Sequence, residues 1–351
     1  MINLSFDIFL IGILFSFILL TLLYLTKNIH IKYSRDNDKG PQKIHNHLAI
    51  RTGGIIIIPS YLLASYFFED NQIYFMKLCL VLIPAFLLGL FEDFSKNVSP
   101  IWRFVAIVIT AHLIKFNLGI SLTDFALFKI ENFLLILSLT VIGITTMSNA
   151  YNMIDGLNGL ALGTGMISFI SFFLLALKTG DTNTANLTLF LVFPFIALFT
   201  FNFPFGNIFI GDAGAYILGC SVSIVAIVIS ENNHSINPFC SFLIMIYPLY
   251  ECIRTFFRRL ITNQKVYNPD NQHLHSLVYQ LFQYRMLKKY ANPLSSLLIL
   301  LFPLSSSLWA YLNFNNQNNL IFGTIVFLIV YELITLVVLK KLKTKISGCK
   351  L

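Results

Sequence analysis

The sequence has few charged residues, since Asp, Glu, Lys and Arg make up only 11% of its 351 residues. Soluble domains are about 25% charged. A chain that is 56% hydrophobic, with a mean hydropathy of +0.75, cannot bury that much apolar surface in water. Most of the chain is therefore expected to face lipid. The net charge of +8 does not indicate a nucleic-acid partner, because the charges lie between apolar segments and form no basic stripe.

Cysteine is also scarce. The five cysteines form no CxxC pair and no set at zinc-ligand spacing, which argues against a disulfide framework and a structural metal. The sequence has no GxGxxG, GxxxxGK[ST] or GxSxG segment. ATP hydrolysis by a P-loop and serine-hydrolase chemistry are therefore not expected.

Long apolar runs are what the chain has in quantity. A bilayer core requires about 20 apolar residues per helix. On that basis the sequence predicts an all-α polytopic membrane protein, folded as one domain over residues 1–351, with a long loop at 254–293 as a candidate functional segment. Eleven spans are predicted, near residues 4–26, 52–68, 73–91, 102–120, 132–150, 157–177, 187–203, 213–230, 237–253, 294–312 and 319–340.

Basic residues are distributed unevenly between the two sides of these predicted spans. Twenty of the 24 lysines and arginines fall in the segments on one side, around residues 27–51, 96–103, 254–289 and 340–350. Loops on the opposite side, such as 69–72 and 313–319, carry none. Because basic loops stay in the cytoplasm, we predict an outside N-terminus, a cytoplasmic C-terminus and a cytoplasmic 254–293 loop.

Five polar clusters interrupt the apolar pattern, all on the predicted cytoplasmic side. Each has an ordinary explanation, such as a solvated helix end, a helix cap or a hydrogen-bonded seam between helices. Unpaired buried charges are nevertheless costly. Because all five clusters lie on one side of the membrane, we favour an active site there. The candidate residues are Lys43, His45, Glu92, Asp93, Asn149, Asn152, Asp155, Asn158, Phe209, Asp212, Arg259, His273 and His275.

Three of these candidates are carboxylates at the ends of predicted spans. The adjacent Glu92 and Asp93 require a nearby cation, either a metal or an arginine. Asp212 lies between Gly211 and Gly214 at the start of a span. This setting suits Mg²⁺, which takes one or two protein carboxylates and completes its shell with water and substrate phosphate.

The remaining clusters are rich in amides and histidines. Asn149, Asn152, Asp155 and Asn158 recur every three residues, so they line one side of a helical turn and predict a polar cavity. The segment 273–275 has the pattern HxH, but no third ligand at zinc spacing accompanies it. Contact with phosphate is therefore the favoured role for the two histidines.

In order and spacing, these clusters resemble the polyprenyl-phosphate N-acetylhexosamine-1-phosphate transferases of glycosyltransferase family 4, over about residues 38–276. Asp93 matches the second acid of the family's Asp-Asp pair, and Glu92 replaces the first. Asn152 and Asp155 match residues of the family's NxxNxxDG segment, and Phe209 and Asp212 match residues of its FxGD segment. His273 and His275 match two histidines of its HxHH segment. The departures are Asn158 for aspartate, Ala215 for serine and Ser276 for the last histidine.

The resemblance implies an enzyme of the bacterial cytoplasmic membrane that transfers a sugar 1-phosphate from a UDP-sugar to undecaprenyl phosphate and releases UMP. It implies Mg²⁺ on Asp212 and Asp93, with Mn²⁺ as the alternative metal. Glu92, Asp93, Asp155 and Asp212 would be catalytic, Phe209 would stack on uracil, and Lys43, Arg259 and the two histidines would bind phosphate. The remaining substrate-binding residues would be His45, Asn149, Asn152 and Asn158. Membrane lipids are expected partners, and a homodimer stays open.

Besides the favoured glycan-initiation reaction, two alternative functions remain open at this point. O-antigen, capsule or teichoic-acid initiation with an N-acetylhexosamine is favoured over the phospho-MurNAc-pentapeptide reaction of peptidoglycan synthesis, because the latter branch shows three successive histidines. A secondary transporter would also have many helices with polar residues inside the membrane. Transporters, however, place such residues near the midplane, whereas these cluster at one interface.

Overall fold

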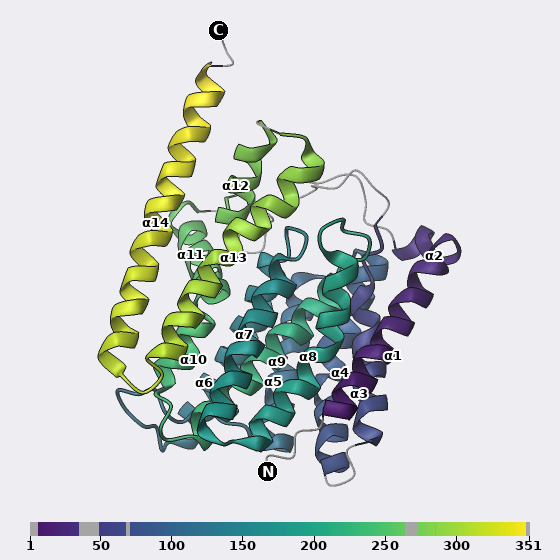
Figure 1. Cartoon of the computed structure of the whole chain (residues 1–351), viewed down its shortest axis with the longest axis vertical. Helices are drawn as coiled ribbons and strands as arrows, with labels where there is room; N and C mark the ends of the chain where they lie inside the picture. Colours follow the sequence, from purple (N-terminus) through teal and green to yellow (C-terminus); the bar gives the residue numbers. More distant parts are fainter. Residues whose placement is uncertain (1–5, 35–48, 68–70, 264–271, 285, 349–351) are drawn as a thin grey trace.

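The computed structural model describes residues 6–34, 49–67, 71–263, 272–284 and 286–348, and this part of the chain is almost entirely helical (Figure 1). One short 3₁₀ helix, η1, accompanies the α-helices. The elements are α1 (Phe6–Leu25), α2 (Lys27–Ser34), η1 (Gly53–Ile56), α3 (Ile57–Tyr66), α4 (Gln72–Ser95), α5 (Pro100–Leu118), α6 (Phe133–Ile154), α7 (Leu160–Thr179), α8 (Thr182–Asn202), α9 (Gly211–Asn232), α10 (Pro238–Ile244), α11 (Ile246–Ile261), α12 (Leu274–Gln283), α13 (Lys288–Leu312) and α14 (Gln317–Gly348).

Nine helices of the described residues are long and apolar enough to cross a membrane. The span predicted at 237–253 is the pair α10 and α11, which is bent by 73° at its break. The span predicted at 52–68 is the shorter apolar helix Gly53–Tyr66. The polytopic all-α class is confirmed, whereas the number of eleven crossings and their orientation stay predictions.

The described residues of the stretch 254–293, which are 254–263, 272–284 and 286–293, are mostly helical, whereas a loop was predicted there. This stretch contains the end of α11, all of α12 and the start of α13. Figure 1 shows α12 near the upper end of the molecule, with the last turns of α14 extending beyond it. The described part of this segment therefore forms a helical cap at one end of the bundle, and its two histidines lie in that cap.

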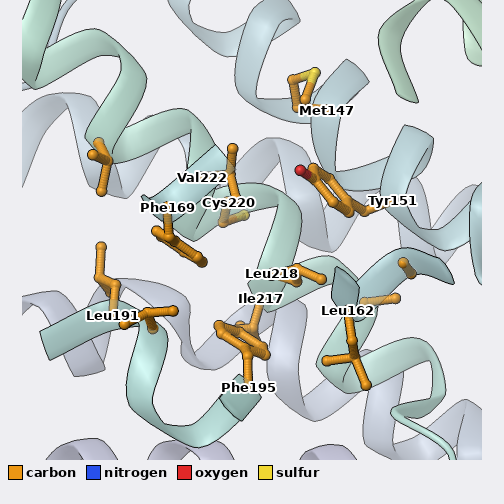
Figure 2. Packing of buried hydrophobic residues seen from close by; sticks show 14 of the residues in the cluster. Met147, Tyr151, Leu162, Phe169, Leu191, Phe195, Ile217, Leu218, Cys220 and Val222 are labelled. Atoms are coloured by element: carbon orange, nitrogen blue, oxygen red, sulfur yellow. The ribbon is translucent and has the colours of Figure 1, made fainter. Parts of the chain in front are cut away.

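Helix α9 lies at the centre of the bundle. In an apolar stretch of 18 residues within each helix, 94% of the residues are buried in α9, compared with 17% in α1 and 22% in α14. Figure 2 shows Ile217, Leu218 and Val222 of α9 surrounded by aromatic side chains such as Tyr151 of α6 and Phe195 of α8. The outer helices keep apolar side chains exposed, as expected of surfaces that face lipid.

Small residues allow α4 to approach α9 closely at the end of the bundle that holds the polar clusters. A Cβ atom on Gly89 of α4 would lie 2.5 Å from the Cα of Ala213, which is a backbone atom that cannot move aside cheaply. Gly143, in the middle of α6, has no such neighbour within 4 Å. The spacing of α4 and α9 therefore depends on the absence of a side chain at residue 89.

We expect Gly89→Ala to lower the melting temperature in detergent by several degrees, because overpacking of a tight core costs about 1–3 kcal/mol. Gly143→Ala is the matched control and should be neutral or slightly stabilising, since alanine favours helix more than glycine does. Thermal unfolding of the two purified variants measures both effects. Equal melting temperatures for the two variants would contradict the close packing of α4 on α9.

Candidate active site

Asp93, at the end of α4, caps the first turn of α9. Its Oδ1 accepts a hydrogen bond from the backbone N–H of Asp212 at 2.8 Å, and its Oδ2 accepts one from that of Ala213 at 3.2 Å. The Asp93 side chain is fully buried. A carboxylate at a helix N-terminus satisfies backbone donors that have no partner within the helix and interacts favourably with its dipole. Asp93 therefore fixes the position of the Asp212 backbone.

Gly211 makes this turn sterically feasible. Its φ is +69°, a conformation that residues with a side chain rarely adopt. A Cβ atom there would also lie 2.5 Å from Oδ2 of Asp93 and 2.3 Å from the carbonyl oxygen of Arg51. The glycine immediately before Asp212 is thus required both for the backbone conformation and for the approach of the neighbouring acid.

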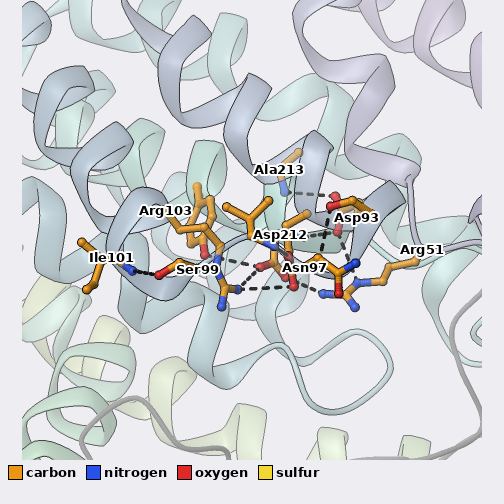
Figure 3. A network of polar contacts seen from close by, with 12 residues as sticks. Arg51, Asp93, Asn97, Ser99, Ile101, Arg103, Asp212 and Ala213 are labelled. Atoms are coloured by element: carbon orange, nitrogen blue, oxygen red, sulfur yellow. Dashed lines mark hydrogen bonds and ion pairs between the residues drawn. The ribbon is translucent and has the colours of Figure 1, made fainter.

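Two guanidinium groups bind the carboxylate of Asp212, as Figure 3 shows. Arg51 donates through Nη2 to Oδ1 at 2.8 Å, and Arg103 donates through Nη1 to Oδ2 at 2.7 Å. Arg51 also lies 3.2 Å from Asp93, measured from Nε to Oδ1. The prediction that the acids need a nearby cation is met here by arginine. Removal of either partner would leave a buried charge without compensation, which is strongly destabilising.

A short pairing between distant segments brings Arg51 to this network. Ile50 and Ile208 form an isolated parallel bridge, in which the Phe209 N–H donates to the Ile50 carbonyl at 2.7 Å. The N–H of Gly53 then donates to the Phe209 carbonyl at 3.0 Å. These backbone bonds align the start of η1 with the segment before α9, so that Arg51 meets Asp212.

Glu92 has a different environment from its neighbour. Its Oε2 accepts a hydrogen bond from the backbone N–H of Val98 at 2.9 Å, which shapes the turn between α4 and α5. Its Oε1 lies 3.9 Å from Nη1 of Arg103. Glu92 therefore reaches the network only at its edge, through Arg103, whereas Asp93 binds the first turn of α9 directly.

The predicted stripe of amides ends α6 and leads into α7. Asn149 donates to the carbonyl of Thr145 at 2.8 Å, and Asn152 and Asp155 are half-buried. Asn158 is buried, and its side-chain N–H donates to the Pro204 carbonyl at 2.8 Å. An aspartate could not donate this bond, which gives a physical reason for asparagine here. The substrate roles of these residues stay predictions.

The two histidines lie together at the start of α12. Their rings stack with centroids 5.3 Å apart and planes 9° from parallel, and both side chains are buried. A Cβ atom on Gly156 would lie 2.7 Å from Nε2 of His275, so this histidine contacts the end of the amide stripe. His273 contacts Glu251 of α11, with 3.2 Å between Nδ1 and Oε2.

Contacts thus connect residues from all five predicted polar clusters. Arg51, from the cluster that also contains Lys43 and His45, pairs with the carboxylates. Asn158 reaches the turn before α9, and His275 lies against Gly156. Arg259 is buried on α11, four residues after Thr255 and eight residues after Glu251. All three buried residues therefore lie on one face of the helix. Lys43 and His45 lie outside the described residues.

Arg103, Glu251 and Arg51 were not among the candidate residues. Arg103 and Glu251 could have been identified from the sequence, because each is a charged residue inside a predicted apolar span. No pattern in the sequence, however, indicates which opposite charge each would meet.

The donor set fits a divalent cation bound through one carboxylate. Within the described residues no group of three or more His, Cys, Asp or Glu side chains could hold a metal. Mg²⁺ does not require one, since it commonly binds one or two carboxylates together with water and substrate phosphate. A carboxylate has about four acceptor positions, so Asp212 keeps acceptor capacity beside its two arginine bonds and a longer bond from the Tyr216 hydroxyl at 3.4 Å. Both oxygens of Asp93 already accept backbone bonds.

Comparisons with known proteins identify the family of this chain. The sequence model described as glycosyl transferase family 4 matches residues 53–230, just over half of the chain. A probable undecaprenyl-phosphate N-acetylglucosaminyl 1-phosphate transferase of Bacillus subtilis is 26% identical over 271 residues, which cover 73% of this chain and 74% of that protein.

Two further relatives extend the comparison. An undecaprenyl-phosphate alpha-N-acetylglucosaminyl 1-phosphate transferase of Thermotoga maritima is 26% identical over 235 residues, 67% of this chain and 69% of that protein. A phospho-N-acetylmuramoyl-pentapeptide-transferase of Limosilactobacillus fermentum is 32% identical over 166 residues, 43% of this chain and 50% of that protein. The family match and the apolar helices together show that the chain belongs to glycosyl transferase family 4 and is a multi-pass membrane sugar-1-phosphate transferase.

Proposed function

We propose that this enzyme transfers an N-acetylhexosamine 1-phosphate from its UDP-sugar to a polyprenyl phosphate, as the first step in assembly of a cell-envelope glycan. The ion-pair network around Asp212 carries the proposal. Two polyanions must meet in this reaction, so the site must hold cations at fixed positions. The names of the Bacillus and Thermotoga relatives support undecaprenyl phosphate as the acceptor and N-acetylglucosamine 1-phosphate as the group transferred.

In the proposed reaction an oxygen of the lipid phosphate attacks the β-phosphorus of the UDP-sugar. A new P–O bond forms, the bond from that phosphorus to the bridging oxygen breaks, and UMP leaves with the bridging oxygen. Arg51 and Arg103, held by Asp212, bind phosphate oxygens as they approach. Both lipid phosphate and diphosphate are already ionised at neutral pH, so positioning and charge compensation matter more than a strong base.

Asp212 is the residue we assign to Mg²⁺, or to Mn²⁺ in its place. The ion supplies charge neutralisation and polarises the phosphate when bound there. Asp93 orients Asp212 through the first turn of α9, and Glu92 restrains Arg103 at the edge of the network. Phe209 is assigned to the uracil ring, and Arg259 with the histidine pair is assigned to the phosphates.

The proposed topology has eleven crossings with an outside N-terminus and a cytoplasmic active site. Figure 1 supports an odd number, because α1 begins at the lower end of the bundle and α14 ends at the upper end. We expect Asn315→Cys, in an exposed loop, to react with an impermeant maleimide on intact cells. Asn97→Cys, exposed beside the carboxylates, should react only after permeabilisation. The parent chain gives the background, and external labelling at residue 97 would overturn the orientation.

A membrane assay with undecaprenyl phosphate tests the reaction itself. UDP-GlcNAc, UDP-GalNAc and UDP-MurNAc-pentapeptide are supplied separately, and UMP release and the mass of the lipid product are recorded. We expect a lipid-linked N-acetylhexosamine product. A product with the muramoyl peptide alone would instead favour the peptidoglycan reaction, to which the Limosilactobacillus relative is assigned. Absence of UMP with every donor would contradict the proposed function.

A further inference from the structure

We propose that Glu251, a buried carboxylate of α11, is a positioning residue that fixes the protonation form and the orientation of His273. The inference rests on the proposed function, because it assigns His273 to substrate phosphate. Glu251 lies inside an apolar segment and is 0% exposed. A charge in this position is costly unless several donors satisfy it. The identity of those donors shows what the carboxylate does.

Three donors surround the Glu251 carboxylate. Oε1 accepts a hydrogen bond from the backbone N–H of Leu274 at 3.0 Å and another from the hydroxyl of Tyr331 on α14. Oε2 faces Nδ1 of His273 at 3.2 Å. The backbone bond fixes the start of α12 immediately after His273, and the side-chain bond fixes the ring. One carboxylate thus joins α11, α12 and α14 around this histidine.

This geometry specifies which ring nitrogen of His273 carries the hydrogen. A carboxylate only accepts hydrogen bonds, so Nδ1 must be protonated to bond with Oε2 at 3.2 Å, and the Thr255 hydroxyl, 3.4 Å from the same nitrogen, is then the more distant neighbour. Nε2 is then the ring nitrogen directed away from Glu251. A proton bound at Nε2 gives a cation whose charge Glu251 compensates, and a charged donor binds phosphate more strongly than a neutral one.

Stacking connects this arrangement to the rest of the site. The His273 ring lies parallel to that of His275, which in turn contacts Gly156 at the end of the amide stripe. Fixing His273 therefore also limits where His275 can lie. The shared burial of Glu251, Thr255 and Arg259 on one face of α11 gives the histidine pair a rigid support on that side.

Glu251→Gln makes a sharp test, because the two oxygens of Glu251 have different partners. The amide oxygen can replace Oε1 toward Leu274 and Tyr331, which leaves the amide N–H₂ facing Nδ1 of His273. The neutral ring must then accept at Nδ1 and carry its hydrogen on Nε2. We expect ¹⁵N NMR of histidine-labelled protein to show Nδ1 of His273 protonated in the parent and unprotonated in the variant. The same protonation state in both would overturn the proposal.

The kinetic expectation for Glu251→Gln is a fall in kcat on the order of a hundredfold, with KM for the UDP-sugar changed less than about threefold. Glu251→Asp keeps the charge and should recover part of the rate. Glu332→Gln is the matched control, because Glu332 binds Arg254 and Tyr250 and should leave kcat near the parent value.

Tyr331→Phe separates positioning from stability. It removes one donor from Glu251 but leaves the contact with His273, so kcat should fall much less than in Glu251→Gln even if both variants melt earlier. Equal loss of kcat in the two variants, in proportion to their melting temperatures, would overturn the positioning role. The NMR result does not depend on turnover, so a protein that fails the transferase assay but shows the Nδ1 change would contradict only the proposed function.

Discussion

Replacing Asp212 with asparagine is expected to lower the maximal rate of sugar-phosphate transfer by more than about a hundredfold, since loss of a group that organises transition-state charge costs several kcal/mol. Asp212 holds both Arg51 and Arg103. Asparagine keeps the shape of the side chain but removes its charge and places an N–H₂ group opposite one guanidinium. The variant should therefore lose the metal ligand and the fixed positions of the arginines together.

Initial rates of UMP release at several Mg²⁺ concentrations, at equal protein amounts, measure this effect. Asp181→Asn is the matched control, since Asp181 caps α8 by accepting from the Thr184 N–H at 2.9 Å and plays no part in the carboxylate network. That variant should keep its rate within a few fold. Near-normal Mg²⁺-dependent turnover in Asp212→Asn would remove Asp212 from the active site.

The second large effect is expected for Asp93→Asn. Asp93 accepts two backbone N–H bonds and pairs with Arg51, so the substituted N–H₂ would face a donor whichever way the amide is turned. Breaking a buried pair by removal of one charge costs about 3–5 kcal/mol. We expect a lower melting temperature and a kcat reduced by about a hundredfold, with a smaller change in affinity for the UDP-sugar.

Glu92 provides the neighbouring comparison. Glutamine at residue 92 can still accept the Val98 N–H, so Glu92→Gln should lose only a moderate factor from its missing charge. Glu92→Asp should keep most of the activity, because the carboxylate is retained one methylene away. If both residues formed a solvated helix end, all three variants would behave alike and near the parent, as surface substitutions usually do. Uniform rates would thus exclude the acidic pair from the site.

The sequence was sufficient for features that depend on local composition. A helix in lipid satisfies its own backbone hydrogen bonds, so a long apolar run already defines a spanning helix whatever its neighbours are. The spans predicted at 73–91 and 213–230 accordingly lie within α4 and α9. The prediction was less good where a helix is short or bent, as in Gly53–Tyr66 and α10 with α11, because packing and not hydropathy sets those shapes.

The presence of polar clusters could also be read from the sequence, but their partners could not. Glu92 and Asp93 are adjacent, yet only the packing of α4 on α9 makes one a helix cap and the other an edge contact. Arg51 meets Asp212 across 161 residues through the Ile50 and Ile208 bridge. Such pairings depend on the three-dimensional path of the chain.

The sequence by itself therefore determined the solvent of this protein, its helical class and the presence of polar clusters, because apolar length and buried charge act locally. Only the tertiary structure decided which charges meet. It placed Asp93 under the first turn of α9, two arginines on Asp212 and Glu251 against His273. The reason is physical: a buried charge must be satisfied by whichever donor the packing brings within hydrogen-bond distance, and packing is a property of the whole bundle.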